Sequence, residues 1–330
     1  MKKFGVIGQG FVGGSLTTVM AERGATVYTY DKAGKRAEGA ARLDAVRVSS
    51  EGIFEWDPAN SVRDFVQKCY SMKGFSGIYF VCVPTPMYSD GSADTSIVES
   101  VLEEIAGVDT GDSAKIAVVK STVPPGSTQR WNEKFGPKGL HIVFNPEFLT
   151  EANALDDMRN QNRIILGGPR PHINQVKMLF QSAFPNVPII KTSSTTAEMV
   201  KYMTNCHLAV KVSFANEMSQ ICESLDERGY NIDYDKVVEY AKFDKRLGES
   251  HWSVPGPVPS DDGRYVMGFG GHCFPKDLNA LVHLAESVGV MPLVMKAAWE
   301  KNMEVRDPRD RDWERQLGRA VSLRLKDAEE

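Results

Sequence analysis

The chain has 330 residues, of which 42% are hydrophobic, enough for two packed domains. Its formal net charge is −4 and it carries no basic stripe or arm, which argues against nucleic acid as a partner. It has no apolar run of about 18 residues, and its first residues lack the features of a signal peptide, so we expect no membrane partner.

The cysteines and histidines indicate neither disulfides nor a metal site. The six histidines show no metal-ligand spacing, so no metal is predicted. The five cysteines are an odd number without a framework spacing, and we expect free thiols in a reducing, cytoplasmic compartment. They are Cys69, Cys82, Cys206, Cys222 and Cys273.

The first 31 residues predict a strand, a turn, a helix over 11–23 and a second strand, a unit that binds a dinucleotide. Gly8 allows the tight turn, Gly10 lets the backbone approach a pyrophosphate, and Gly13 allows the helix to pack closely. Asp31 ends the second strand, where a carboxylate would bond a ribose diol and repel a 2′-phosphate. The pattern therefore favours NAD over NADP, the alternative being a glycine-rich loop of another α/β domain.

Further apolar runs alternate mostly with helical stretches, which predicts an α/β fold with a Rossmann-type, doubly wound parallel sheet. The predicted strands are 77–84, 115–122, 141–148, 163–168 and 187–192. Ligands of such sheets bind at the carboxyl ends of the strands. Those ends carry polar groups beside prolines, although the prolines alone could simply mark strand exits. They read Val83-Pro84-Thr85-Pro86, Lys120-Ser121-Thr122-Val123-Pro124 and Asn145-Pro146-Glu147.

From about Ser194 the pattern becomes helical. No Gly or Pro interrupts the chain until Gly229, which predicts one long helix, a spine between domains or a dimer interface. Lys201, Asn205 and Glu198 share one face of this helix, and a solvated face is the plain alternative. We predict an NAD-binding domain over 1–195 and, over 196–330, the long central helix with a smaller all-α domain for substrate and dimerisation.

The rest of the second half predicts short helices and one site-forming loop. Residues 248–271 are rich in Gly and Pro and too long for an idle connection, so we expect them to shape a site. Helices are expected over 231–242, 275–289 and 291–306. The charged segment 307–330 is expected to form a final exposed or packing helix.

Within "GFGGHCFPKD" (268–277), Cys273 is followed by Pro275, which suits the first turn of a helix, and by Lys276 and Asp277. A cation nearby and a helix start are typical of a reactive thiolate. A buried structural cysteine in a tight turn is the alternative and, for an isolated cysteine, the more common case.

These motifs, taken together, resemble the UDP-glucose/GDP-mannose dehydrogenase family over nearly the whole chain, most closely its UDP-glucose branch. The motifs, in order, are "GVIGQGFVG", "VCVPTP" with "DGSADTS", "KSTVPPGST", "NPEFLTEANALDD", "EMVKYMTN", "KRLGESH" and "GFGGHCFPKD". The resemblance implies a four-electron oxidation in which a sugar primary alcohol becomes a carboxylate and two NAD are consumed.

The resemblance also implies catalytic roles. Cys273 would trap an aldehyde as a thiohemiacetal, which loses a second hydride to give a thioester. Lys201, helped by Asn205, would stabilise the oxyanion. Asp277 would position or activate water with Thr122.

Glu147 would be the base for thioester hydrolysis. The expected cofactor-binding residues are Gly8, Gly10, Phe11, Val12, Gly13, Asp31, Val83, Pro84, Thr85, Ser121, Thr122 and Lys276. The expected substrate-binding residues are Phe148, Leu149, Glu151, Lys201, Asn205, Arg246 and Gly270. Arg246 matches a family arginine that reaches a neighbouring subunit's substrate, which implies a homodimer built on the long helix.

Family members usually continue into a second Rossmann-like domain that grips the nucleotide, whereas this sequence stops at Glu330. We expect a fragment, a naturally short form, or contacts supplied by a partner. Segment 254–265 is also longer than expected for many members.

Other functions stay open on the sequence alone. GDP-mannose or a UDP-N-acetyl-hexosamine could be the substrate. A two-electron β-hydroxyacid dehydrogenase would share the cofactor fold and long helix without needing Cys273, and a catalytically weak nucleotide-sugar-binding protein is a further alternative.

Overall fold

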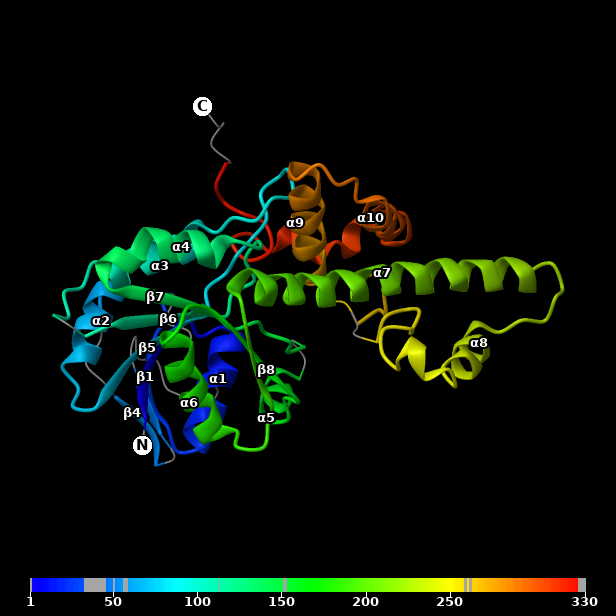
Figure 1. Ribbon diagram of the computed structural model, residues 1–330. Coiled ribbons are helices and arrows are strands. Elements are labelled where there is room, and N and C mark those ends of the chain that lie inside the picture. Colours follow the sequence, from blue (N-terminus) through cyan, green and yellow to red (C-terminus); the bar gives the residue numbers. More distant parts are fainter. Residues whose placement is uncertain are drawn as a thin grey trace. The chain divides into compact units, whose positions relative to one another are not determined.

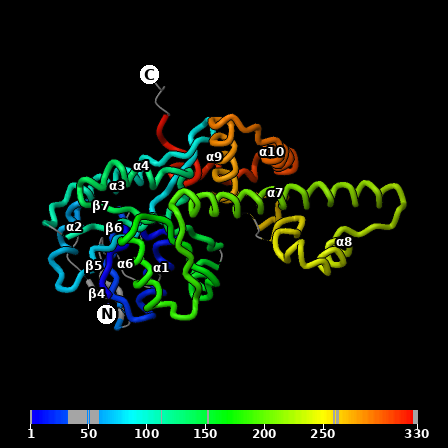
Figure 2. Tube along the Cα trace, viewed as in Figure 1, coloured from blue at the N-terminus to red at the C-terminus, as the bar shows by residue number. Residues whose placement is uncertain are grey.

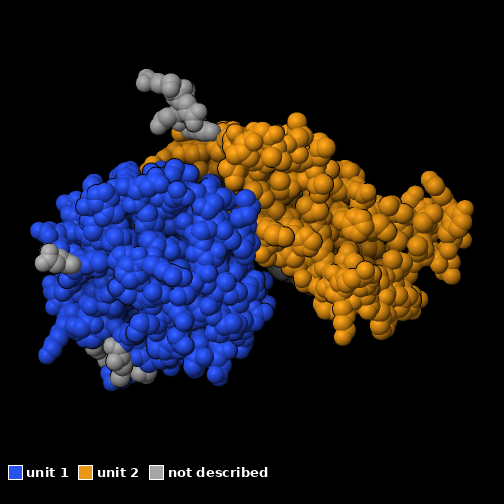
Figure 3. Space-filling model, in the orientation of Figure 1, with its two compact units in different colours: residues 1–85, 95–201 blue, residues 86–94, 202–330 orange. Residues whose placement is uncertain are grey.

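The computed structural model describes residues 2–32, 46–49, 51–55, 59–111, 113–150, 153–257, 260 and 263–325 (Figure 1). The chain divides into two compact units, coloured separately in Figure 3. The first unit comprises Met1–Thr85 and Thr95–Lys201, and the second comprises Pro86–Asp94 and Tyr202–Glu330. The division between units thus falls inside the long helix, a few residues beyond the predicted domain boundary.

The first unit is built on a sheet whose nine described strands run in the order β4-β3-β2-β1-β5-β6-β7-β8-β9. The strands are β1 (Lys3–Ile7), β2 (Thr26–Tyr30), β3 (Val46–Ser49), β4 (Gly52–Glu55), β5 (Phe75–Val81), β6 (Lys115–Val119), β7 (Leu140–Phe144), β8 (Ile164–Gly167) and β9 (Ile189–Thr192). The described helices of the unit, before the long helix, are α1 (Phe11–Glu22), α2 (Val62–Tyr70), α3 (Ser96–Ala106), α4 (Ser127–Phe135), the 3₁₀ turn η1 (Gly136–Lys138), α5 (Ala154–Arg159) and α6 (His172–Ala183).

The predicted α/β, Rossmann-type fold is confirmed, but the sheet is mixed rather than wholly parallel. Strands β2, β1, β5, β6 and β7 pair in parallel, and their order reverses between β1 and β5, where ligands of such folds bind. The β2–β3, β3–β4 and β7–β8 pairs are antiparallel. Apolar runs do not reveal strand direction, because a buried strand reads the same in either orientation.

Alternating side chains of the central strands feed two hydrophobic cores, one on each face of the sheet. On β5, Tyr79 and Val81 belong to the core that includes residues of α2, α3 and α4. Ile78 and Phe80 belong to the other core, with residues of α1, α5 and α6. Helices therefore cover both faces, as a doubly wound sheet requires (Figure 1).

In the second unit the described regular elements are helices, as predicted. The long helix α7 spans Ser194–Asp226, and Gly229, at φ +86°, allows the turn that follows it. The other helices are α8 (Tyr234–Ala241), η2 (Lys245–Leu247), α9 (Phe274–Ser287), α10 (Leu293–Val305), η3 (Pro308–Asp310) and α11 (Asp312–Arg315). Figure 2 follows their path from green α7 to the red end of the chain.

A small core joins α7 to α9 within the second unit. Tyr202, Cys206 and Ala209 of α7 pack with Leu278 of α9 and with Phe269 of the preceding loop.

Among the described residues, no helix has both the length and the apolar character needed to cross a membrane.

The expected helix over 307–330 is wrong for the described part of that segment. Only η3 and the four-residue α11 form, and the chain then runs beside residue 87, where Met87 N donates to Ala320 O and Ser322 N donates to Met87 O, both at 2.8 Å. Gly318, at φ +73°, turns the chain. Charged residues of this segment form local pairs, such as Arg309 with Asp307 at 2.9 Å.

Candidate functional site

The glycine-rich turn after β1 is shaped by close backbone contacts. Gly8 has φ +90°, and a Cβ there would lie 2.5 Å from the carbonyl oxygen of Cys82. A Cβ on Gly13 would lie 1.9 Å from the carbonyl oxygen of Gly8. Both positions therefore require glycine for packing of β1, α1 and the neighbouring strand.

Gly10 differs from Gly8 and Gly13, because the space beside it, at the N-terminus of α1, is unfilled by the described residues. It is the N-cap of α1, no side chain caps the helix, and its first turn carries no acidic residue. A Cβ on Gly10 would meet no atom of the described residues within 4 Å. Phe11 and Val12 follow as the first, half-buried residues of α1. The open space at this uncapped helix N-terminus fits the pyrophosphate of a dinucleotide such as NAD.

Asp31 lies directly after β2 and is tied to this turn. Its Oδ2 accepts a hydrogen bond from the backbone N–H of Gln9 at 2.7 Å. This hydrogen bond fixes the Asp31 carboxylate beside the glycine-rich turn. The ribose of a dinucleotide bound at the turn would need a hydrogen-bond acceptor at that position.

The carboxyl ends of β5 and β6 meet beside the turn. Ser121 Oγ donates to the carbonyl oxygen of Val83 at 2.6 Å, which joins the two strand ends. Thr85 is buried, whereas Pro84 is exposed and Thr122 is half-buried. The expected cofactor-binding residues of these strand ends are thus held together within the first unit.

The end of β7 carries a buried polar cluster around Glu147. Its Oε1 accepts from the backbone N–H groups of Phe148 at 2.6 Å and Leu149 at 2.9 Å. Its Oε2 lies 3.0 Å from Lys120 Nζ, which also donates to Asn145 Oδ1 at 2.9 Å. The sequence identified Lys120 and Asn145 only as polar residues at strand ends. Nothing in it indicated the ion pair between Lys120 and Glu147.

The polar face at the start of α7 is buried. Glu198, Lys201 and Asn205 are 0%, 6% and 7% exposed, so the alternative of a solvated face is wrong. Lys201 Nζ donates to the carbonyl oxygen of Glu147, which brings two expected catalytic residues together.

Glu198 caps α4 rather than pointing to solvent. Its carboxylate accepts from the backbone N–H groups of Gly126 at 2.6 Å and Thr128 at 2.8 Å. Burial raises the pKa of Glu198, although these backbone hydrogen bonds oppose the shift. This carboxylate therefore positions the loop after β6, where Ser121 and Thr122 lie.

In the second unit, Cys273 stands at the N-cap of α9, as the Pro275 position predicted. Asp277 lies one turn on; its Oδ2 accepts from Asn205 Nδ2 at 2.6 Å, and its Oδ1 lies 2.6 Å from Lys276 Nζ. Cys206 Sγ lies 3.6 Å from the carbonyl oxygen of Asp277. Three of the expected catalytic residues, Asn205, Cys273 and Asp277, are thus placed together at the start of α9.

The Cys273 thiol is half-buried and acidic for a cysteine. Burial acts to raise its pKa, but the neighbouring His272 imidazole and the Lys276 ammonium outweigh burial and the Asp277 carboxylate. The net pKa lies below the usual value, unlike that of Cys206, which burial raises. A lowered pKa in a partly accessible thiol favours the reactive cysteine over the structural one.

The loop before Cys273 is held by α10 and by the segment after it. Asn302 Oδ1 accepts from Phe269 N at 2.7 Å, and a Cβ on Gly268 would lie 2.4 Å from that oxygen. A Cβ on Gly270 would lie 2.3 Å from the guanidinium of Arg306, so this expected substrate-binding residue is packed against an arginine.

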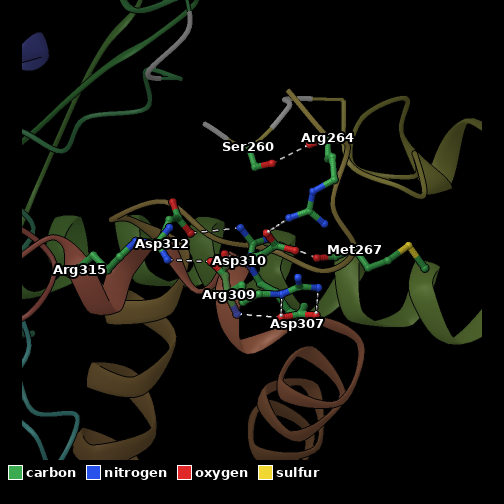
Figure 4. A network of polar contacts seen from close by, with 9 residues as sticks. Ser260, Arg264, Met267, Asp307, Arg309, Asp310, Asp312 and Arg315 are labelled. Carbon is green, nitrogen blue, oxygen red and sulfur yellow. Dashed lines mark hydrogen bonds and ion pairs between the residues drawn. The ribbon is translucent and has the colours of Figure 1, made fainter. Parts of the chain in front are cut away.

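The segment after α10 forms a charged network with this loop (Figure 4). Arg306 Nη2 lies 3.1 Å from Asp312 Oδ1, whose Oδ2 accepts from Gly271 N at 2.9 Å. Asp310 Oδ1 lies 3.0 Å from Arg264 Nη2. The sequence did not reveal this network, because charges that pair across a loop have no periodic spacing.

Lys276 and Arg246, two of the expected residues, each pair with a carboxylate. Lys276, expected at the cofactor, is 8% exposed and paired with Asp277. The Arg246 side chain is 88% exposed and pairs with Asp244 at 2.5 Å, so the second unit by itself gives it no ligand role. Glu151 lies outside the described residues. The described residues contain no cluster of three His, Cys, Asp or Glu side chains suited to a metal ion.

Comparison with known proteins matches both halves of the chain. Residues 2–183 match the model of the UDP-glucose/GDP-mannose dehydrogenase family NAD-binding domain, and residues 195–304 match that family's central domain.

Among individual proteins, the chain is 32% identical to YtcA of Bacillus subtilis (strain 168) over 308 residues, covering 91% of this chain and 67% of YtcA. It is 31% identical to UDP-glucose 6-dehydrogenase TuaD of the same organism over 314 residues, covering 93% of this chain and 64% of TuaD. The chain thus spans about two thirds of the length of these relatives.

Among solved structures, the chain resembles a UDP-glucose dehydrogenase from the hyperthermophilic archaeon Pyrobaculum islandicum. The TM-score is 0.72 at 28% identity, and the match covers 92% of this chain and 68% of that one.

Proposed function

Because the chain belongs to the UDP-glucose/GDP-mannose dehydrogenase family, we propose that it oxidises the C6 primary alcohol of a nucleotide sugar to a carboxylate with NAD. UDP-glucose is the proposed substrate and UDP-glucuronate the product, in line with the name of TuaD. The observation that carries the proposal is the thiol of Cys273, with its lowered pKa, beside the Asn205–Asp277–Lys276 cluster.

The proposed reaction is a balanced four-electron oxidation. One alcohol, one water and two NAD⁺ give one carboxylate, two NADH and three protons. NAD, when bound, accepts a hydride in each of the two oxidations. Gly8, Gly10 and Gly13 with the start of α1 would hold its pyrophosphate, and Asp31 its ribose.

Cys273 would keep the intermediate aldehyde from reaching water. Its sulfur would bond the carbonyl carbon to give a thiohemiacetal, and the second oxidation would give a thioester. Lys201 would stabilise the developing oxyanion with its ammonium group, helped by Asn205. The hydrogen bond from Asn205 to Asp277 supports this role, because it fixes the amide at the start of α9.

Hydrolysis of the thioester would complete the reaction. Asp277 and Thr122 would position the water, and Glu147 would serve as the base. The bonds from Lys120, Phe148 and Leu149 hold the Glu147 carboxylate in one orientation, which supports a role that needs a fixed acceptor. The proposed substrate-binding residues remain Phe148, Leu149, Glu151, Lys201, Asn205, Arg246 and Gly270.

We also propose a homodimer formed through α7. Its support in the second unit is a stripe of exposed apolar residues at helical spacing, Met203, Phe214 and Ile221, which are 70%, 51% and 45% exposed. The exposed Arg246 would then reach the partner's substrate. A cytoplasmic location remains part of the proposal.

A substrate panel tests the function. Purified chain would be incubated with NAD and, separately, UDP-glucose, GDP-mannose and a UDP-N-acetyl-hexosamine, and NADH formation would be followed by absorbance. We expect the highest kcat/KM with UDP-glucose. A higher value with another sugar would reassign the substrate, and sugar binding without NADH formation would indicate a binding protein.

A further inference from the structure

A buried arginine, Arg306, joins the loop before Cys273 to the segment that follows α10. Only 7% of Arg306 is exposed, and its guanidinium pairs with Asp312 at 3.1 Å. Its Nε donates to the carbonyl oxygen of Asp310 at 2.7 Å, and its Nη1 donates to the carbonyl oxygen of Met267 at 3.2 Å (Figure 4). The guanidinium is thus bonded both to the loop and to the segment after α10, and these acceptors compensate for its burial.

The Arg306–Asp312 pair lies directly on the glycine backbone of this loop. A Cβ on Gly270 would lie 2.3 Å from Arg306 Nη2 and 2.4 Å from Asp312 Oδ1. Asp312 Oδ2 accepts a hydrogen bond from Gly271 N at 2.9 Å, so one carboxylate contacts both the arginine and the loop. Gly271 takes φ +69°, a conformation that favours glycine, and the chain therefore turns two residues before Cys273.

The residue after Cys273 is connected to the same segment through aromatic rings. The ring of Phe274 lies 6.1 Å from that of Phe269, at an interplanar angle of 81°. The Phe269 ring lies 6.2 Å from Trp299 of α10, whose ring is 5.8 Å from that of the buried Trp313. Edge-on and tilted ring contacts are favourable beyond the apolar area that they bury. Residues on both sides of the thiol are therefore connected to α10 and the segment after it.

We propose that Arg306 and Asp312 are positioning residues for Cys273: their ion pair holds residues 268–271 so that the thiol meets the aldehyde where the aldehyde forms. The effect on catalysis rests on the proposed function. Neither side chain makes or breaks a bond, and both act through the backbone of the loop. Such positioning matters because a displacement of about 1 Å can lower a rate about a hundredfold. Segment 306–313 is therefore part of the catalytic apparatus.

The ratio of NADH formed to sugar consumed distinguishes positioning from support of the fold. Oxidation of the alcohol to the aldehyde does not need the thiol, whereas the second oxidation does. In Asp312→Ala we expect the ratio with UDP-glucose to fall from about two toward about one, because aldehyde escapes before the thiol bonds it. Carboxylate formation should fall on the order of tenfold, with the KM for UDP-glucose within about twofold of wild type. A loss of folded protein alone would lower the rates of both oxidations and leave the ratio at about two.

Glu304→Gln is the matched control, because Glu304 is a carboxylate of the same unit that pairs with Lys301, at 3.1 Å. Its ratio should remain about two. Should Asp312→Ala not fold, Asp312→Asn keeps an acceptor for Gly271 N–H but loses the charge that faces Arg306, and it should still lower the ratio. A ratio of about two in every folded Asp312 variant, or an equal fall in Glu304→Gln, would overturn the proposal.

Hydrogen exchange measures the loop without turnover. Amide exchange in a peptide spanning 268–273 should be several-fold faster in Asp312→Ala than in wild type, because Gly271 N–H loses its acceptor, and unchanged in Glu304→Gln. Unchanged exchange in Asp312→Ala would show that Asp312 does not hold the loop, and would also overturn the proposal. If exchange rises in Asp312→Ala but the wild-type chain yields no NADH with any sugar of the panel, the positioning of Cys273 stands and the proposed function fails.

Discussion

Asp31, directly after β2, accepts a hydrogen bond from the backbone N–H of Gln9 in the glycine-rich turn. Asp31→Asn keeps an acceptor for that N–H but removes the charge. We expect NAD binding to weaken several-fold and the preference for NAD over NADP to fall about tenfold, because the variant no longer repels a 2′-phosphate. Titration calorimetry with both dinucleotides would measure this.

Glu22→Gln is the control for Asp31→Asn, since Glu22 ends α1 and pairs with Arg159 on the same unit. It should leave both affinities as in wild type. Retention of the full NAD preference in Asp31→Asn would show that Asp31 does not set cofactor choice.

Individual residues were predictable where a motif gave them a chemical reason. The turn glycines, Asp31, Asn205, Asp277 and Cys273 lie on the predicted turn, strand end and helices, because those elements follow from local sequence patterns. Lys120 and Asp312 were missed as partners of Glu147 and Gly271, since residues far apart in sequence meet there.

The loop before α9 depends on glycines in a left-handed conformation. Gly268 has φ +67° and no room for a Cβ beside Asn302. A Cβ on Gly263, at φ +81°, would meet no atom of the described residues within 4 Å. Gly268→Ala should lower the free energy of unfolding by about 2 kcal/mol or more, from backbone strain and displacement of Asn302. Gly263→Ala should show the strain alone, about 1 kcal/mol. Denaturant unfolding would compare them.

Equal losses of stability in Gly268→Ala and Gly263→Ala would contradict the role given to the Asn302 contact. That contact fixes the loop through both the N–H and the carbonyl of Phe269, at 2.7 and 3.1 Å. We therefore also expect only Gly268→Ala to change the alkylation rate of Cys273.

Helices and strands could be predicted where the hydrophobic periodicity of a segment agreed with the glycine or proline residues at its ends. The long helix α7 and the predicted strand runs are present because these signals are local. The antiparallel β7–β8 pair was not predictable, because strand direction depends on the path of the connection. The helix predicted for the tail after α10 was wrong, and the pairing of its charges with each other and with the loop at 264–271 leaves no periodic signal in the sequence.

At the scale of the whole molecule, the exposed apolar stripe on α7, formed by Met203, Phe214 and Ile221, has no function within a single chain that we have described. Met203→Glu would place a charge in the proposed dimer contact, so we expect sedimentation to show monomer where wild type shows dimer. Met178→Glu, on α6 with 61% exposure, is the control and should remain dimeric. A monomeric wild type, or an unaffected Met203→Glu dimer, would refute assembly through this helix.

The central claim is that Cys273 carries the sugar through a second oxidation, and the NADH formed per sugar consumed tests it most directly. With UDP-glucose and excess NAD, the wild-type chain should give about two NADH per sugar, whereas Cys273→Ser should give no more than about one and no carboxylate. A ratio of about one in the wild type, or full carboxylate formation by Cys273→Ala, would contradict the thioester route.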